Sequence, residues 1–334
     1  MALAPGDVID FSANVNPFGP APAVREAIAK ADIASYPDDA ALRQVIAAGL
    51  GIAPANVLPA NGSVELLWLV VQAYLSPNDP VLIVGPTFGE YERACLIGGA
   101  RVHWLRADAA QEFYLDLEET ARLLDLYQPR LLFLCNPNNP TGVYLRRAEI
   151  ERLLAHCQRT LLVVDEAFVG FVEAADSLID LAVDGRLLLL RSMTKDHALA
   201  GLRLGYAVGD QETMAALRTV QPPWNVSAAA QAGGIAALAD REHLALSLAR
   251  IREAKHYLAQ EIISQGLKVY PAETNFLLAQ VGDAARFRAA LLRRGCCVRD
   301  CSSFGLPDCI RIGVRSVPDC RRLVAAINEV LREG

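Results

Sequence analysis

A lysine, two hydroxyl residues and an arginine lie close together in the second half of the chain. Ser192, Thr194 and Lys195 share one short run, and Arg203 follows in a Gly-Leu-Arg segment. A lysine amine can condense with the aldehyde of pyridoxal phosphate, while hydroxyl groups and a guanidinium hold the phosphate of that cofactor. The run therefore predicts a pyridoxal 5'-phosphate site, with Lys195 as the catalytic residue.

Two further polar residues follow apolar runs that are typical of buried strands. Asp165 comes directly after residues 161–164, and Asn139 lies in an Asn-Pro-Asn-Asn-Pro-Thr-Gly run after residues 131–135. A carboxylate beside a pyridine nitrogen keeps that nitrogen protonated, which makes the cofactor ring an electron sink. A helix cap would explain the aspartate alone, and a turn would explain the asparagine alone. Upstream of Lys195 in this order, both are better interpreted as cofactor-binding residues.

Gly62, Ser63 and Val64 stand at the start of a predicted helix. Free backbone N–H groups at a helix start, together with a serine hydroxyl, suit a phosphate. An ordinary N-cap at Ser63 explains the same residues equally well. Phe88 follows another predicted strand and could stack on the cofactor ring, although a core aromatic is the simpler interpretation of that residue alone.

These residues must be positioned by a sheet, because short apolar runs alternate with amphipathic stretches between residues 40 and 220. The predicted strands are 80–84, 101–105, 131–135, 161–164, 187–190 and 204–208. The alternation predicts an α/β fold with a mostly parallel central sheet and helices on both faces. Ligands of such sheets bind beyond the carboxyl ends of the strands, where these motifs fall.

The pattern changes after a Gln-Pro-Pro-Trp segment at residues 221–224. We expect residues 1–40 to form an N-terminal arm belonging to a small domain and residues 41–225 to form a large cofactor-binding domain. Residues 226–334 then contain an interdomain helix, alanine-rich and interrupted near Asp240, and a small C-terminal α+β domain.

Composition excludes several classes of partner. Of the 334 residues, 53% are hydrophobic and 21% are charged, so a folded core is expected. The net charge of -6 argues against a nucleic acid. No apolar run approaches the roughly 20 residues of a membrane span, and the first residues do not read as a signal peptide, so a cytoplasmic location is expected. No pair among the eight cysteines has C-x-x-C spacing, so we expect reduced thiols and no metal site.

The motifs, taken in order, resemble those of the fold-type I pyridoxal-phosphate-dependent aminotransferases, and the similarity covers nearly the whole chain. It is greatest to the branch that contains the threonine-phosphate decarboxylases and the histidinol-phosphate aminotransferases. Residues 10–17, 221–224 and 298–304 look like the decarboxylase, an enzyme of cobalamin biosynthesis.

This resemblance implies a role for each matching position. Lys195 would bind the cofactor covalently and transfer protons, Asp165 would pair with the pyridine nitrogen, and Asn139 would donate to the phenolate oxygen. The residues implied to hold the phosphate are Ser63, Ser192 and Arg203, with Gly62, Val64 and Thr194 beside them.

The resemblance also implies a homodimer and a phosphorylated amino acid as substrate. Tyr36 matches a tyrosine that reaches the phosphate from the neighbouring subunit. Asn16, Arg299 and Arg311 match substrate-binding positions. Two guanidinium groups suit a substrate with both a carboxylate and a phosphate, since arginine binds either group bidentately. An exposed strand-end charge is the alternative for each arginine.

Two positions depart from the pattern. Phe168 stands where aminotransferases usually have a tyrosine whose hydroxyl donates to the cofactor phenolate. Many of the decarboxylases carry a His-Gly-Gly segment ahead of the position of Asp10, and here no histidine precedes His103. We therefore expect other groups to bind the substrate phosphate, or a different substrate.

The expected reaction is decarboxylation of L-threonine O-3-phosphate to (R)-1-amino-2-propanol O-2-phosphate. Whichever bond at Cα lies perpendicular to the cofactor plane breaks, so a modest tilt would give amino transfer instead. The alternative is therefore an aminotransferase for histidinol phosphate or a related amino acid. A non-catalytic pyridoxal-phosphate-binding protein is a third possibility, which the set of Lys195, Asp165, Asn139 and Arg203 disfavours. A nucleotide-dependent dehydrogenase is disfavoured because no G-x-G-x-x-G follows a strand.

Overall fold

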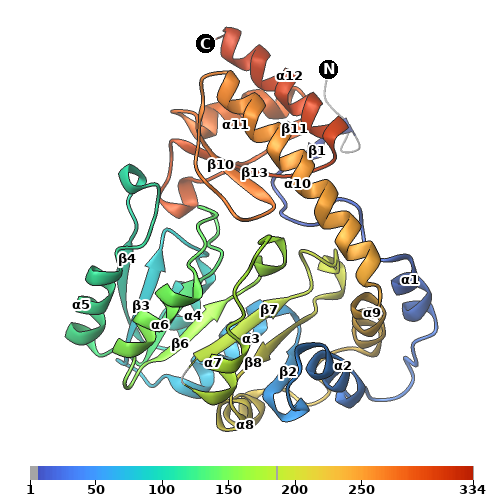
Figure 1. The fold of residues 1–334 in the computed structure, drawn as a ribbon, viewed down its shortest axis with the longest axis vertical. Coiled ribbons are helices and arrows are strands. Elements are labelled where there is room, and N and C mark those ends of the chain that lie inside the picture. Colours follow the sequence, from blue (N-terminus) through green and yellow to red (C-terminus); the bar gives the residue numbers. More distant parts are fainter. Residues whose placement is uncertain (1–6, 186, 334) are drawn as a thin grey trace.

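A computed structural model describes residues 7–185 and 187–333 and shows a large domain and a smaller one (Figure 1). One long helix, α10 (Arg241–Ser264), begins beside the large domain and ends in the small domain. Its apolar residues, among them Ile251 and Leu258, pack in the core of the small domain. The two domains are therefore joined by one continuous helix.

The large domain is built on a seven-stranded sheet with the order β2-β8-β7-β6-β5-β3-β4. Its strands are β2 (Val57–Ala60), β3 (Pro80–Gly85), β4 (Arg101–Arg106), β5 (Leu131–Cys135), β6 (Leu161–Asp165), β7 (Leu187–Ser192) and β8 (Gly205–Val208). Strands β3 to β7 run parallel, whereas β8 is antiparallel to both β7 and β2. The predicted α/β fold with a mostly parallel sheet is confirmed.

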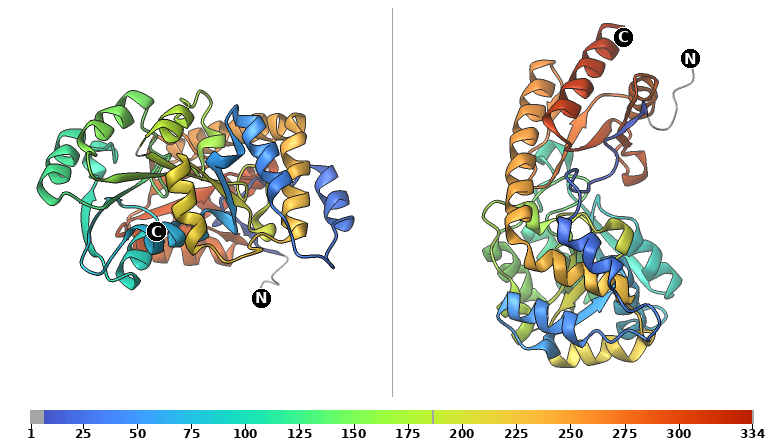
Figure 2. Two further views of the ribbon diagram at one scale, coloured as in Figure 1. Left: turned by 90° about the horizontal axis from the view of Figure 1, so that it is seen from below. Right: turned by 90° about the vertical axis from the view of Figure 1, so that its right-hand side faces the viewer.

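The central strands are apolar up to their carboxyl ends because helices cover both faces of the sheet (Figure 2). Alternate residues of β5 point to opposite faces. Leu132 and Leu134 belong to the apolar core on one face of the sheet, whereas Leu131 and Phe133 belong to the core on the other face. An unbroken apolar run is thus the sequence of a strand that has no exposed face.

The helices divide between these two faces. One face carries α3 (Gly62–Tyr74), α4 (Glu90–Ile97) and α8 (Gln211–Val220). The other carries α2 (Ala40–Leu50), α5 (Leu117–Tyr127), α6 (Arg147–His156), α7 (Ile179–Asp184) and α9 (Ala228–Ala239), with α1 (Pro22–Ala29) packed on α9. Short 3₁₀ turns lie in the connections, namely η2 (Pro54–Asn56), η3 (Ala109–Gln111), η4 (Val169–Phe171) and η5 (Ala200–Leu202).

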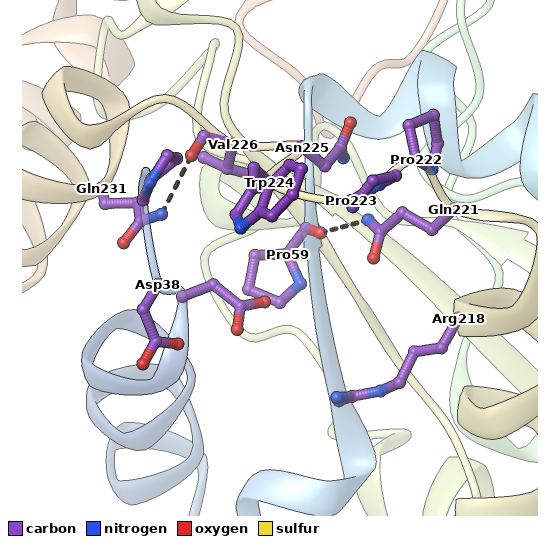
Figure 3. Close-up of a pocket in the computed structure, with 12 residues that line it drawn as sticks. Asp38, Pro59, Arg218, Gln221, Pro222, Pro223, Trp224, Asn225, Val226 and Gln231 are labelled. Carbon is purple, nitrogen blue, oxygen red and sulfur yellow. Dashed lines mark hydrogen bonds between the residues drawn. The ribbon is translucent and has the colours of Figure 1, made fainter. Parts of the chain in front are cut away.

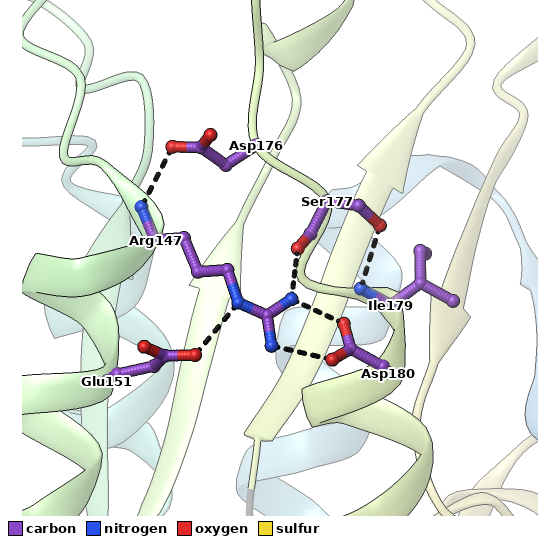
Figure 4. Close-up of polar contacts among 6 residues, drawn as sticks. All are labelled: Arg147, Glu151, Asp176, Ser177, Ile179 and Asp180. Atoms are coloured by element: carbon purple, nitrogen blue, oxygen red, sulfur yellow. Dashed lines mark hydrogen bonds and ion pairs between the residues drawn. The ribbon is translucent and has the colours of Figure 1, made fainter.

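A polar network joins the start of α6 to the segment after β6 (Figure 4). The Arg147 guanidinium donates two hydrogen bonds of 2.6 Å to the carboxylate of Asp180 and a third, of 2.8 Å, to the backbone oxygen of Ser177. Its Nε donates to Glu151 at 2.8 Å. Since this network is exposed to solvent, its ion pairs are screened and contribute little to stability, and the network mainly holds the loop at the start of α6.

The small domain holds a four-stranded antiparallel sheet with the order β12-β13-β10-β9. Its strands are β9 (Lys268–Val269), β10 (Phe276–Gln280), β12 (Arg299–Asp300) and β13 (Cys309–Gly313), with η6 (Ser302–Phe304) between the last two. Helices α11 (Ala284–Arg293) and α12 (Val317–Glu333) pack with α10 around it. At its margin, β1 (Ile9–Asp10) pairs in parallel with β11 (Cys296–Cys297).

The packing of the N-terminal arm and of α9 bears on the expected division into domains. Residues 1–6 of the predicted arm lie outside the described residues, and only the segment around β1 joins the small domain. Helix α1 packs on α9 instead, with Val24 in the large-domain core. Helix α9 also belongs to that core. Helix α10 begins after Asp240, whose side chain accepts a hydrogen bond from the His243 N–H and caps the helix.

No helix in the described part of the chain has both the length and the apolar composition of a membrane span. None of the eight cysteines, all of which lie among the described residues, forms a disulfide, and all except Cys297 are buried. Within residues 7–185 and 187–333, no three histidine, cysteine, aspartate or glutamate side chains gather as a metal site would require.

Candidate active site

A cavity of about 270 Å³ opens at the carboxyl ends of the parallel strands. Asp165 ends β6, Ser192 ends β7, and Asn139 lies in the loop after β5. The predicted residues that line the cavity are Ser63, Val64, Phe88, Asn139, Asp165, Phe168, Ser192, Thr194, Lys195, Arg203 and Arg311. The lining residues that motif reasoning did not select are Ser12, Ala13, Asn14, Val15, Tyr91, Cys135 and Ala167.

Lys195 is held between positive and negative neighbours. Burial lowers the pKa of its amine, and the charges of Arg203 and Arg311 lower it further, while Asp165 opposes them. A lowered pKa increases the fraction of neutral amine, which is the nucleophilic form. The backbone oxygen of Lys195 accepts a hydrogen bond from the Asn16 N–H at 2.9 Å, which ties this loop to the N-terminal arm.

Asp165 is 7% exposed and has two hydrogen-bond donors. The Tyr91 hydroxyl donates to Oδ2 at 2.7 Å, and the Ala167 N–H donates to Oδ1 at 3.0 Å. Burial raises the pKa of the carboxyl, and these two bonds and the charge of Lys195 act against that shift. A cation next to Asp165, such as a protonated pyridine nitrogen, would favour the ionised carboxylate.

Arg311 reaches the cavity from β13 of the small domain and is 8% exposed. Its guanidinium donates to Oδ1 of Asn139 and, at 2.8 Å, to the backbone oxygen of Ser12. Nε has no hydrogen-bond partner among the described residues. Burial lowers the pKa of Arg311 to about 10, and the nearby charge of Arg299 also lowers it. Because Asn139 accepts through its oxygen, its NH₂ group is left to donate elsewhere.

Another part of the cavity is suited to a phosphate. Helix α3 begins there, and no side chain of its N-cap residue Asn61 caps its first turn. Arg203 packs so closely on Gly62 that a Cβ on that glycine would lie 3.0 Å from Nη2. The hydroxyls of Ser192 and Thr194, which also line the cavity, lie 2.7 Å apart. Helix N–H groups, hydroxyls and a guanidinium are the donor set that a phosphate requires, so the residues present fit pyridoxal phosphate.

Besides Gly62, which packs against Arg203, three predicted residues lie outside the cavity lining. The Asn16 side chain donates to the backbone oxygen of Asp196 and accepts from the Phe18 N–H, so both ends of its amide are engaged. Arg299 is exposed and donates to Ser303 Oγ at 2.9 Å. It is the cross-strand partner of Arg311 and therefore lies on the same face of the small sheet. Asn14, two residues before Asn16, lines the cavity, and its buried Oδ1 has no partner in the described part of the chain.

Tyr36, the third, is 78% exposed and stacks on Trp224, with the ring centroids 4.3 Å apart. Trp224 lines a separate groove with Asp38, Pro59 and Arg218 (Figure 3). Trp224 is itself 60% exposed. Within this chain, Tyr36 therefore does not reach the cavity.

Phe168 lines the cavity, and its ring centroid lies 5.9 Å from the Lys195 amine. With pyridoxal phosphate bound, the lack of a hydroxyl here would leave more negative charge on its phenolate oxygen, which would favour the protonated form of an adduct between Lys195 and the cofactor. Phe168→Tyr should lower the pKa of this adduct by about one unit, the value of one hydrogen bond to a charged group. Absorbance against pH measures this pKa, and equal values in both proteins would refute the explanation.

This fold and this lysine-bearing cavity define a fold-type I enzyme that uses pyridoxal 5'-phosphate. The chain matches the aminotransferase class I and II family over residues 6–327 and belongs to that family. It is 36% identical to histidinol-phosphate aminotransferase 1 of Thiobacillus denitrificans over 340 residues, covering 99% of this chain and 87% of the relative.

Two solved structures are similar over the whole chain. Histidinol-phosphate aminotransferase from Sinorhizobium meliloti, in complex with pyridoxal-5'-phosphate, is 28% identical with a TM-score of 0.90, covering 98% of this chain and 91% of that one. L-threonine-O-3-phosphate decarboxylase from Porphyromonas gingivalis is 26% identical with a TM-score of 0.86, covering 97% and 100% respectively. The chain is therefore similar in structure both to a histidinol-phosphate aminotransferase and to a threonine-phosphate decarboxylase.

Proposed function

We propose that the protein is an aminotransferase that moves the amino group of histidinol phosphate to a 2-oxo acid. The observation that carries this proposal is that the Lys195 amine, the Asp165 carboxylate and the Arg311 guanidinium line one cavity. The relative from Thiobacillus denitrificans carries the same activity in its name. Amino transfer was the alternative at the level of sequence, and it is now better supported than decarboxylation.

Each residue has a distinct task in this proposal. When bound, pyridoxal phosphate accepts the electron pair left behind when a bond at Cα of the substrate breaks. The Lys195 amine would take the proton from Cα and deliver it to the carbon on the other side of the amino nitrogen. Asp165 holds the positive charge of the pyridine ring, and the NH₂ group of Asn139 donates to the phenolate oxygen. Ser63, Ser192 and Arg203 hold the phosphate.

Arg311 would receive the anionic group of each substrate in turn. Histidinol phosphate has a phosphate and no carboxylate, whereas a 2-oxo acid such as 2-oxoglutarate brings carboxylates. A guanidinium binds either group through two parallel N–H donors. Since histidinol phosphate has no carboxylate to lose, only its Cα–H bond can break to start the reaction.

Decarboxylation of L-threonine O-3-phosphate is the second candidate. It is favoured by the 26% identity to a decarboxylase of that substrate over 97% of this chain. Residues 10–17 and 298–304 resemble that branch as well. In this case Arg311 would hold the substrate so that the Cα–carboxylate bond lies perpendicular to the cofactor plane.

The two candidates differ in their products. Purified protein saturated with cofactor is given L-histidinol phosphate and 2-oxoglutarate, and glutamate is measured. A parallel sample receives L-threonine O-phosphate, and carbon dioxide release is followed. We expect glutamate in the first sample and none when Lys195→Ala replaces the wild type. Carbon dioxide release in the second sample without glutamate in the first would establish the decarboxylase instead.

We further propose a homodimer in which Tyr36 reaches the phosphate of the partner subunit's cofactor. In support, Ile33, Tyr36 and Trp224 expose 86%, 78% and 60% of their surface, so large apolar side chains gather on this face. Tyr36→Ala and Lys195→Ala should each be nearly inactive alone. Mixing the two variants after partial unfolding should restore activity, because one site of each mixed dimer is intact. Mixtures that stay inactive would contradict the shared site.

A further inference from the structure

Tyr91 on α4 forms a hydrogen bond with a site residue that is distant in sequence. Its side chain is fully buried, and its hydroxyl donates a 2.7 Å hydrogen bond to Oδ2 of Asp165 at the end of β6. Both residues line the cavity. A buried phenol that donates to a buried carboxylate is a charge-assisted hydrogen bond, which is stronger than one between neutral groups.

The Tyr91 ring is fixed by two aromatic neighbours. It stacks on Phe133 of β5 with the ring centroids 5.3 Å apart and the planes at 10°. Phe88, which lines the cavity, meets it edge-on at 5.8 Å and 87°. These contacts restrict both torsions of the side chain, so the hydroxyl is held at one place beside Asp165.

The carboxylate of Asp165 is thereby held in one plane. One oxygen accepts from Tyr91 and the other from the Ala167 N–H. Each carboxylate oxygen can accept two hydrogen bonds, so one acceptor position remains on each. We propose that Tyr91 is a positioning residue, which aims a remaining acceptor position of Asp165 at the pyridine nitrogen of the cofactor. This proposal rests on the function proposed above for Asp165.

The pKa shifts of Asp165 and Tyr91 agree with this hydrogen bond. Burial raises the pKa of the Asp165 carboxyl, whereas the bond from Tyr91 lowers it, so Tyr91 favours the ionised form that can hold a pyridinium. Burial and the charge of Asp165 raise the pKa of Tyr91 itself. The phenol therefore remains a neutral donor. Tyr91 itself has no other function in the proposed reaction.

The test is a double-mutant cycle of Tyr91→Phe and Asp165→Asn, which isolates the coupling between the two residues. Tyr91→Phe removes one oxygen and keeps both ring contacts. Four quantities are measured: kcat and KM for amino transfer, the dissociation constant of the cofactor, and the pKa of the Lys195–cofactor adduct from its absorbance. Tyr270→Phe, a buried tyrosine in the small domain, is the matched control.

Tyr91→Phe should lower kcat roughly 10- to 100-fold, the value of one hydrogen bond to a charged group, with KM nearly unchanged. The cofactor should bind more weakly, and the pKa of the adduct should shift. In the Asp165→Asn background, Tyr91→Phe should have almost no further effect. Thermal melting without cofactor should resemble that of the Tyr270→Phe control.

Two results would contradict the role inferred for Tyr91, and a third would also contradict the function proposed for Asp165. Wild-type kinetics and absorbance in Tyr91→Phe would show that the hydroxyl has no such effect. An equal loss in the Asp165→Asn background would show that Tyr91 acts independently of Asp165. Unchanged activity and absorbance in Asp165→Asn itself would refute the proposed function of Asp165, and the inference with it.

Discussion

Lys195→Ala is expected to lower amino transfer by about 10⁴-fold or more, because it removes both the covalent attachment point and the group that transfers the proton. Lys195 is the only lysine among the residues that line the cavity in the described part of the chain. Its amine is favoured in the neutral form by burial and by two arginines. No neighbouring side chain can therefore take over both of its tasks.

Steady-state rates and the visible absorbance of the cofactor adduct measure this effect. Both should be lost in Lys195→Ala. The control is Lys30→Ala, which should behave as wild type, because Lys30 is exposed at the end of α1 and forms a surface salt bridge with Glu26. An alanine variant at position 195 that keeps a tenth of the activity would contradict the assignment.

Arg311→Met should lower kcat/KM by about 100-fold or more for both substrates. Removing one partner of a buried, hydrogen-bonded charge pair costs roughly 3 kcal/mol, and 1.4 kcal/mol corresponds to a factor of ten. Arg311 is buried, and its Nε has no partner among the described residues, so this donor is available to a substrate anion. Methionine keeps much of the length of the side chain and removes the charge.

The loss in Arg311→Met should appear mainly in KM, for histidinol phosphate and for 2-oxoglutarate alike. Arg288→Met is the matched control, since Arg288 lies on α11 outside the cavity lining. If Arg311→Met kept wild-type KM values, the substrate anion would have to bind elsewhere, and Arg299 on the same face of the small sheet would be the next residue to replace.

The central strands were predictable because parallel strands buried on both faces read as continuous apolar runs. Strand β2 (Val57–Ala60) was not predicted. It is short, it contains Pro59, and it lies at the edge of the sheet, where a missing N–H is tolerated. The division of the N-terminal arm between the domains could not be predicted from the sequence either, because it depends on the packing of α1 on α9 and on the pairing of β1 with β11.

The site was predictable where a residue ends a strand or begins a helix. Asp165, Ser192 and Ser63 occupy such positions, and the order of the motifs brings them together. Tyr91 was not predicted, because its contact with Asp165 spans 74 residues and neither spacing nor periodicity indicates it. Asn14 was missed for a similar reason. Only the path of the arm decides that Asn14, rather than Asn16, faces the cavity.

The most direct measurement is reduction of the cofactor-saturated protein with borohydride, followed by peptide mass mapping. We expect the added mass of one reduced cofactor on the peptide that contains Lys195 and on no other lysine. An unmodified Lys195 peptide from fully saturated protein would contradict the covalent attachment on which the proposed chemistry depends.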